Sequence, residues 1–241
     1  MNVEIWSDFV CPFCYIGKRR FEEALQQFSG KSEVNIVFRS FELDPDAPRD
    51  AGHDVHDMLA AKYGMSREQA KAMNANVDEQ ARSVGLTYHT DTRVLTNTLD
   101  AHRLTHFAAR HGKGSEMAER LFRAHFTESK HIGDHDTLAA LAAEAGLDRS
   151  GAAAMLAGGE YAQEVRGDER EAASLGVRGV PFFVIDRKYA VSGAQPSEVF
   201  LNALEKAWSE RSTLTVLNES AEDAAEAACE GGACAPSERK S

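Results

Sequence analysis

The sequence predicts an α/β protein whose strands come from two separated segments of the chain. Runs with the alternation and the Val, Ile and Phe content of strands lie near the N-terminus and again near residue 180. The stretch between about 53 and 175 is rich in Ala, Glu, Arg and Leu and contains no convincing strand pattern. We therefore expect an α/β unit interrupted by a large all-helical insertion. With 241 residues, 43% of them hydrophobic, the chain is long enough to bury an extensive core.

The first 43 residues predict a strand, a helix and a second strand in that order. Residues 3–8 alternate as a strand does. The helix that follows Cys14 carries small or apolar residues at spacings of three and four, namely Gly17, Phe21, Leu25 and Phe28, and Gly30 ends it. Residues 34–41 predict the second strand, which the turn sequence at 44–46 (Asp-Pro-Asp) terminates.

Helix start and stop signals divide the central stretch into several helices. Ser66 and Gln69 match a capping box, in which each side chain bonds the backbone N–H of the other residue. Gly85 ends the helix that they begin. Further helices are expected over 97–111, 116–126 and 136–145, with one or two more within 149–174.

Strand character returns at residues 180–185, and a turn leads into a short partner strand over 189–191. Pro196 then opens a terminal helix that runs to about Trp208, because proline fits the first helical turn. The predicted domains are a discontinuous α/β domain over 1–50 and 176–210, a helical insertion over 51–175, and a C-terminal extension over 211–241.

The charge and the hydropathy of the chain bear on its partners and its location. Lys and Arg number 27 against 38 Asp and Glu, a formal net charge of −11, whereas nucleic acids and anionic membranes attract basic surfaces. No stretch reaches the roughly 18 uninterrupted apolar residues of a membrane span. The N-terminus also lacks the basic and apolar segments of a secretory signal. We therefore expect a cytoplasmic protein with no nucleic-acid and no membrane partner.

The first of two cysteine pairs is Cys11–Pro12–Phe13–Cys14, between the first strand and its helix. A helix N-terminus presents unpaired N–H groups and the positive end of the helix dipole, which stabilise a thiolate. We therefore expect an exposed Cys11 to be the nucleophile, and Cys14, one turn inside the helix, to be the resolving thiol. Pro12 fits this turn because its position needs no N–H.

The alternative for this first pair is half of a structural zinc site, which needs a second half of similar tightness. The other cysteines, Cys229 and Cys234, have four residues between them in an acidic tail that contains glycine. Such a second half makes a poor closed site, so the context of strand, CxxC and helix favours redox chemistry.

Pro181 stands at the start of the strand near residue 180 and follows Val180. An X–Pro bond tolerates the cis form at a cost of about 0.5–1 kcal/mol. A cis bond here would expose the backbone N–H and C=O of Val180 to an extended substrate chain. A trans proline at the first position of an edge strand fits the pattern equally well.

Taken together, these features resemble the thioredoxin fold as it is elaborated in the DsbA-like oxidoreductases. The segments WSDFVCPFCYIGK, NTLDAHRLTHFA and GVRGVPFFVI are most similar to the FrnE subgroup of that family, and the resemblance covers about residues 1–210. It implies a thiol-disulfide oxidoreductase that needs no organic cofactor. It also implies that Cys11 is the nucleophile, that Cys14 resolves the mixed disulfide, and that Pro181 is a cis-proline beside them, preceded by Val180.

Two departures from the family pattern narrow the expected activity. Periplasmic DsbA has a signal peptide, and it has a His where this chain has Phe13, so we expect this protein to be less oxidising. Reduction or isomerisation of disulfides in protein substrates, with electrons from a cellular thiol reductant, is therefore preferred over oxidation. We expect Pro12, Phe13 and Val180 to contact the substrate.

Two other functions remain as alternatives. The glutathione-dependent 2-hydroxychromene-2-carboxylate isomerases resemble this chain over the same length, but they carry serine at the position that matches Cys11, so a cysteine argues against that chemistry. A thiol protein that binds a soft metal would retain the metal and show no turnover.

The second pair, Cys229 and Cys234, lies in a tail (218–241) with six acidic and two basic residues. We expect it to exchange electrons with the first pair. The 21 residues from Trp208 to Cys229 span about 25 Å as a flexible chain, against a radius of gyration of about 18 Å for a compact protein of this length, so contact is allowed. A tail without a dedicated role and a metal-binding tail stay open, because acidic surroundings weaken a thiol as a nucleophile. A strand over 213–217 that paired with an exposed sheet edge would give a homodimer.

Three polar residues complete the set of candidates. Asp8, just before the cysteines, is a candidate for moving a proton to or from Cys14. His102 and His106 lie four apart on one predicted helix, but no Glu follows the first His as in a metalloprotease motif. We expect these two histidines to be solvated or to cap the helix.

Overall fold

The computed structural model describes residues 1–211, of which residues 1–209 form one compact unit. Its sheet has four strands in the order β2–β1–β3–β4. β1 (Asn2–Ser7) and β2 (Asn35–Ser40) are parallel, so α1 (Pro12–Gln27) makes the crossover that parallel neighbours require. β3 (Phe182–Ile185) runs antiparallel to β1, and β4 (Tyr189–Ser192) runs antiparallel to β3.

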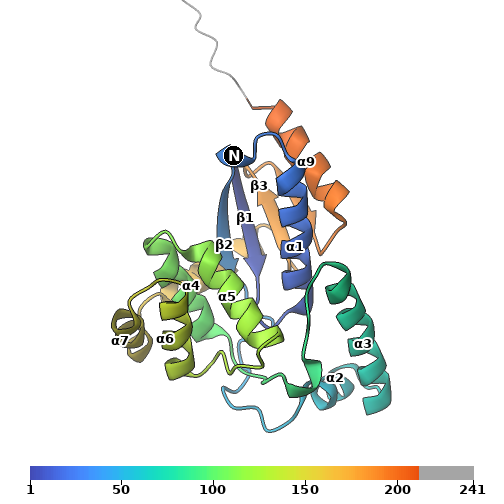
Figure 1. Ribbon diagram of the computed structural model, residues 1–241, viewed down its shortest axis with the longest axis vertical. Coiled ribbons are helices and arrows are strands. Elements are labelled where there is room, and N and C mark those ends of the chain that lie inside the picture. Colours follow the sequence, from blue (N-terminus) through green and yellow to red (C-terminus); the bar gives the residue numbers. More distant parts are fainter. Residues whose placement is uncertain (212–241) are drawn as a thin grey trace, which may run out of the picture. The chain divides into compact units, whose positions relative to one another are not determined.

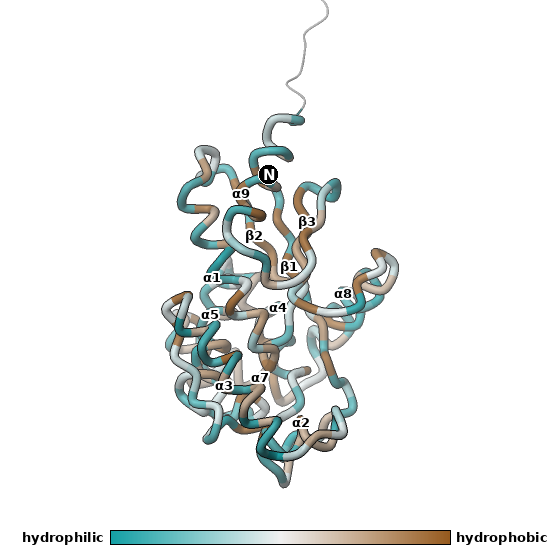
Figure 2. Tube along the Cα trace, turned by 90° about the vertical axis from the view of Figure 1, so that its right-hand side faces the viewer, coloured by the Kyte–Doolittle hydropathy of each residue, from teal (hydrophilic) through white to brown (hydrophobic). Residues whose placement is uncertain are grey.

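Different helices bury the two faces of this sheet. α1 and α9 (Ser197–Ser209) lie side by side on one face, where Ile5 and Phe183 pack against Phe21 and Phe200 (Figure 1). On the other face, Trp6 packs against Ala172 of α8 (Ala162–Ser174). Both faces are therefore apolar, and Figure 2 shows hydrophobic residues along the central strands.

The chain between β2 and β3 is helical, as the composition of that stretch predicts. Its helices are α2 (Val55–Tyr63), α3 (Arg67–Ser83), α4 (Leu99–Arg110), α5 (Gly114–Phe126), α6 (His135–Glu144), α7 (Arg149–Ala157) and α8, with a short 3-10 turn over Thr90–Thr92. A second 3-10 turn, Lys31–Glu33, precedes β2. None of the helices within residues 1–211 combines the length and the apolarity that crossing a bilayer requires.

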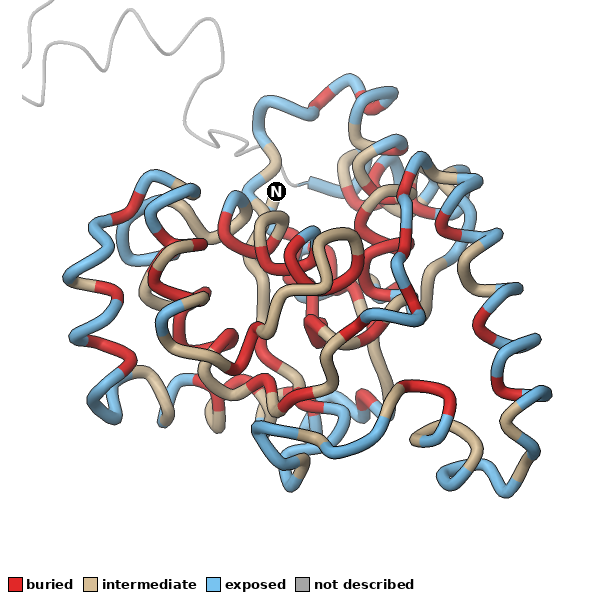
Figure 3. Tube along the Cα trace, turned by 60° about the horizontal axis from the view of Figure 1, so that its bottom comes forward, coloured by how far each residue is buried: buried red, intermediate tan, exposed pale blue. Residues whose placement is uncertain are grey.

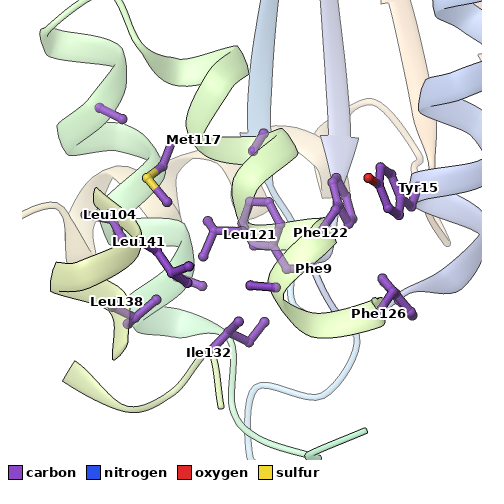
Figure 4. Packing of buried hydrophobic residues seen from close by; sticks show 14 of the residues in the cluster. Phe9, Tyr15, Leu104, Met117, Leu121, Phe122, Phe126, Ile132, Leu138 and Leu141 are labelled. Atoms are coloured by element: carbon purple, nitrogen blue, oxygen red, sulfur yellow. The ribbon is translucent and has the colours of Figure 1, made fainter. Parts of the chain in front are cut away.

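The largest buried cluster joins this helical segment to the start of α1 (Figure 4). Phe9 and Tyr15 enter a core of leucines and aromatic residues from α4, α5 and α6. The ring of Tyr15 stacks on that of Phe122 with 5.0 Å between centroids. Figure 3 shows that buried residues concentrate in the middle of the described part of the chain, away from its outer helical turns. The helical segment is therefore packed directly onto the end of the sheet that carries the first cysteine pair.

Local signals predicted most of these elements correctly. The capping box is present, since the Ser66 hydroxyl accepts from the N–H of Gln69 and the Gln69 amide oxygen accepts from the N–H of Ser66. Many boundaries differ from the prediction by one to three residues, and α2 was not predicted. Two of these differences lie at the cysteine pair and at Pro181. α1 already begins at Pro12, and β3 begins at Phe182, because Pro181 has no N–H to give to the sheet. The division into domains stays a prediction, and the expected strand at 213–217 lies outside the described residues.

Candidate active site

The CPFC sequence forms the first turn of α1, directly after β1. Cys11 is the N-cap residue with extended backbone angles (φ −85°, ψ 113°), and Pro12 is the first helical residue. The N–H of Cys14 donates to the carbonyl of Cys11 at 3.1 Å, which closes the turn. A cap residue supplies the bend into a helix, and proline at the next position loses no hydrogen bond, so this sequence favours the observed geometry.

The loop before β3 meets this turn from the other end of the chain. The Val180–Pro181 peptide bond is cis, which confirms the prediction made from the family resemblance. The Cys11 thiol donates to the carbonyl oxygen of Val180, with 3.6 Å between Sγ and O. The carbonyl of Pro181 accepts from the N–H of Gly193 at 2.8 Å, which holds the loop against β4. Residues 169 positions apart are thus brought together at the Cys11 thiol.

The expectation that Cys11 is exposed is wrong. Only 4% of Cys11 is accessible to solvent, and Cys14 is 2% accessible. Both cysteines belong to the buried cluster that includes Leu86 and Tyr88 from the helical segment, with Val180 packed against it. The sequence predicts Cys11 at a free helix tip, whereas side chains from the helical segment and from the loop before β3 cover that tip. Phe13, at 39% exposure, is the accessible residue of the motif.

The two thiols are adjacent and are not joined by a disulfide. Burial raises the pKa of the Cys14 thiol, and the neighbouring Cys11 raises it further by hydrogen bonding and by charge. The Ser7 side chain and the backbone of Asp8 act in the opposite direction without cancelling this effect. Cys14 is therefore held as a protonated thiol in the reduced protein, which suits a thiol that reacts second.

Comparison with known proteins settles the family. The profile of the DSBA-like thioredoxin domain matches residues 2–205. The chain belongs to the DSBA-like thioredoxin domain family. A probable DsbA oxidoreductase from Streptomyces coelicolor is 47% identical, with a TM-score of 0.85 over 99% of this chain and 100% of that one. The uncharacterized protein YwbO of Bacillus subtilis is 32% identical over 206 residues, which cover 85% of this chain and 96% of YwbO.

A 2-hydroxychromene-2-carboxylate isomerase structure also matches, at 16% identity and a TM-score of 0.65, over 87% of this chain and 95% of that one. At this identity the match shows a common fold alone. This protein is thus a DsbA-like thiol-disulfide oxidoreductase with a thioredoxin-like α/β fold and a helical insertion. Its Cys11–Cys14 pair is a CxxC motif. The roles of the individual site residues stay predictions.

Two buried acidic residues, Asp8 and Glu42, lie near the cysteines in this protein. Asp8 is 1% exposed, and one of its carboxylate oxygens accepts from the N–H of Leu43 at 2.8 Å. The other oxygen lies 3.5 Å from Nε2 of His102 without a regular hydrogen bond. Glu42 is also buried and binds Arg166. Burial raises the pKa of Glu42, although the charges of His102 and Arg166 act against this.

The histidines of α4 correct the expectation that they are solvated. His102 is 2% exposed and tilts against the ring of Phe9 at 4.8 Å between centroids. Nε2 of His106 lies 3.0 Å from a carboxylate oxygen of Asp168 and 3.1 Å from the Ser40 hydroxyl. The ring of His102 thus lies near Asp8 and that of His106 near Asp168, so the two do not form a metal-binding pair. Asp8 as a proton carrier for Cys14 stays a prediction, since its backbone faces the thiol while its carboxylate is bound to Leu43.

Sequence reasoning missed Tyr88, and it missed the buried surroundings of His102. Tyr88 contacts the CPFC turn from 76 residues away, and no local motif marks a tyrosine in a loop. His102 was visible as part of a histidine pair, but only the fold shows that it meets Asp8. Within residues 1–211, no group of three His, Cys, Asp or Glu side chains is arranged to hold a metal ion. Cys229 and Cys234 lie outside the described residues, so their redox role stays a prediction.

Proposed function

We propose that this protein is a cytoplasmic protein-disulfide reductase or isomerase of the FrnE subgroup, with Cys11 as the nucleophile. The observation that carries the proposal is the meeting of Cys11, Cys14 and the Val180 carbonyl at one helix N-terminus. The helix end stabilises a thiolate on its cap residue. The buried, protonated Cys14 one turn later is placed to react second.

The reaction proceeds by two thiol-disulfide exchanges. The Cys11 thiolate attacks one sulfur of a substrate disulfide, forms a new S–S bond with it and releases the second substrate sulfur as a thiolate, which takes a proton. Cys14 then loses its proton and attacks the Cys11 sulfur. The enzyme keeps the Cys11–Cys14 disulfide, and the substrate leaves with two thiols and two electrons gained. A cellular thiol reductant returns the enzyme to the dithiol.

Isomerisation uses the same first step. If the released substrate thiolate attacks another disulfide of the same protein before Cys14 acts, a new disulfide forms and a different substrate thiolate is released. That thiolate then attacks the substrate sulfur of the mixed disulfide, which completes the rearrangement and releases Cys11 as a thiolate. The balance between reduction and isomerisation depends on how quickly Cys14 is deprotonated. Burial, which raises the pKa of Cys14 in the reduced protein, disfavours its thiolate and so favours rearrangement over reduction.

Substrate contact is assigned to the exposed part of the motif and to the loop beside it. Phe13 is the accessible aromatic residue next to the thiols, and an apolar ring binds side chains of a partly unfolded substrate. Pro12 holds the turn that presents Phe13, and the backbone of Val180 offers polar groups to an extended chain.

The second cysteine pair is proposed to pass electrons to the first. Cys229 and Cys234 would reduce the Cys11–Cys14 disulfide by exchange and would then be reduced by the cellular thiol. Protein disulfides are the proposed substrates, with no nucleic-acid or membrane partner. A homodimer formed through 213–217 is proposed as the arrangement to test by gel filtration.

The test is turnover on insulin, read as disulfide reduction, and on scrambled ribonuclease, read as recovered activity. Wild type is compared with Cys11→Ser, Cys14→Ser and the Cys229→Ser/Cys234→Ser double variant. Loss of insulin reduction in the first two supports the proposal, and a weaker double variant supports the relay. Turnover that survives Cys14→Ser and needs glutathione would instead assign the isomerase type of chemistry. Absence of turnover in wild type, with metal retained, would assign metal binding.

A further inference from the structure

Tyr88 is held over the CPFC turn by the helical segment. It lies in the connection between α3 and α4, and hydrogen bonds on both sides fix it to the end of α5. The N–H of His89 donates to the carbonyl of Phe126 at 2.8 Å, and the hydroxyl of Thr127 donates to the carbonyl of Thr87 at 2.8 Å. A residue between two such anchors has little freedom to move away from its site.

The side chain of Tyr88 reaches from these anchors to the first turn of α1. Its ring stacks against Phe126 and Tyr15, with centroids 4.5 and 6.2 Å away. Its hydroxyl donates to the carbonyl oxygen of Pro12 at 2.8 Å. This hydrogen bond ties the helical segment to the residue between Cys11 and Phe13. Burial raises the pKa of Tyr88, so the hydroxyl remains a donor throughout the ordinary pH range.

The consequence is a nucleophile with almost no open surface. Cys11 is 4% exposed, with Val180 at its thiol and Tyr88 bonded to the adjacent residue. A thiolate must reach a sulfur atom of the substrate directly, so the exchange rate depends on access as well as on charge. A disulfide on an extended segment or a short peptide can approach such a shielded sulfur closely, whereas the surrounding surface of a folded protein hinders its approach.

We propose that Tyr88 is a specificity-determining residue whose hydroxyl latch on Pro12 restricts Cys11 to disulfides carried on extended, unfolded polypeptide segments. This inference rests on the proposed function, since it names the substrate class of the same site. The exposed ring of Phe13 beside the opening gives such a segment an apolar contact. The helical segment therefore contributes to the site by positioning Tyr88 at the CPFC turn.

Tyr88→Phe is the decisive variant, because it keeps the stacked ring and removes only the latch. Tyr15→Phe is its matched control, since that hydroxyl donates to Glu119 at 2.7 Å within the same aromatic stack and not to the turn. Thermal unfolding of both variants checks that each remains folded.

The first readout is the labelling rate of Cys11 in the full-length reduced protein, resolved from the other cysteines by peptide mass spectrometry. We expect Tyr88→Phe to raise the rate with a bulky polyethylene-glycol maleimide about fivefold, the factor that corresponds to a net hydrogen bond of about 1 kcal/mol. The rate with small N-ethylmaleimide should change less than twofold. Tyr15→Phe should change neither rate. Equal bulky labelling in wild type and Tyr88→Phe would overturn the proposal.

The second readout is kcat/KM on two substrates, a short disulfide-linked peptide and a folded protein with a surface disulfide. In Tyr88→Phe the ratio of kcat/KM for the peptide to kcat/KM for the folded protein should fall about fivefold. An unchanged ratio would count against restriction of access by Tyr88. If wild type reduces neither substrate while bulky labelling still rises in Tyr88→Phe, the proposed function fails and the restricted access at Cys11 stands. If wild type reduces both substrates with equal kcat/KM, the proposed restriction by Tyr88 fails and the proposed function stands.

Discussion

Gly17 and Pro181 approach so closely that a methyl group on Gly17 would lie 2.9 Å from Cγ of Pro181. The same methyl group would lie 3.4 Å from the Cα of Ala194. Gly17 stands one turn after Cys14 on α1, so the absence of a side chain lets the loop before β3 close against the helix. That closure is what brings the Val180 carbonyl to the Cys11 thiol.

Gly17→Ala should therefore open the site. The added methyl group forces Pro181 or α1 to shift, and overpacking of this kind costs about 1–3 kcal/mol of unfolding free energy. Disulfide reductase kcat/KM should fall with it, because the Val180 carbonyl moves away from Cys11. Urea unfolding and the insulin assay measure the two effects.

The control for this change is Gly167→Ala in α8, where the nearest atom to the added methyl group is the tip of Arg170 at 3.9 Å. Alanine in that helix should leave the unfolding free energy unchanged or raise it by up to about 1 kcal/mol. A Gly17→Ala variant as stable and active as Gly167→Ala would show that the loop does not depend on this contact.

The features that the sequence predicted are those that short segments determine. Cys11 and Pro12 lie in one turn, and the neighbouring residues alone place that turn at a helix start. Pro181 is recognisable because it stands at the start of a predicted strand. Tyr88 and His102 have no such local mark, because their roles depend on packing across the helical segment. The burial of Cys11 was missed for the same reason, since the residues that cover it come from positions 86–88 and 180.

Cys14→Ser should convert a transient intermediate into a stable product. Without the resolving thiol, Cys11 keeps the substrate in a mixed disulfide. Incubation with a disulfide peptide should give an adduct of protein plus one peptide thiol by intact mass spectrometry, absent from wild type and from Cys11→Ser. An adduct on any cysteine other than Cys11 would contradict the assignment of the nucleophile.

Asp168 should be the most costly single charge to remove from the second face of the sheet. Its carboxylate accepts from Arg39 and from the N–H of Ser40 at 3.0 and 2.9 Å, and His106 lies 3.0 Å away. These hydrogen bonds hold the pKa of Asp168 below its usual range, although burial acts to raise it. Asp168→Ala should lower the unfolding free energy by about 2–4 kcal/mol, because the groups of β2 and α4 lose a buried partner.

Urea unfolding at neutral pH measures the effect of Asp168→Ala. The exposed i,i+3 pair of Glu79 and Arg82 provides the comparison, because Glu79→Ala should cost less than about 0.5 kcal/mol. If the two variants lose equal stability, the network around Asp168 does not anchor α8 to the sheet.

His125 should make the protein sensitive to mild acid. It is fully buried beside Phe126, and neither ring nitrogen has a hydrogen-bond partner. Burial lowers the pKa of His125 well below its usual value, and the charges of Arg93 and His131 add to this. The folded protein therefore keeps the ring neutral, while the unfolded chain binds a proton below about pH 6.5. Stability from this group is complete above that pH and is lost as the pH falls, by at most about 1.4 kcal/mol per pH unit.

His125→Leu should reduce the slope of unfolding free energy between pH 6.5 and 5, measured by urea titration at several pH values. His125→Gln separates titration from packing, because glutamine is polar and takes up no proton in this range. Both variants should lose the same part of the slope, whereas at pH 7.5 only their absolute stabilities should differ. A wild-type slope retained in both would mean that another group binds the proton on unfolding, and that the buried ring is not the origin of the acid sensitivity.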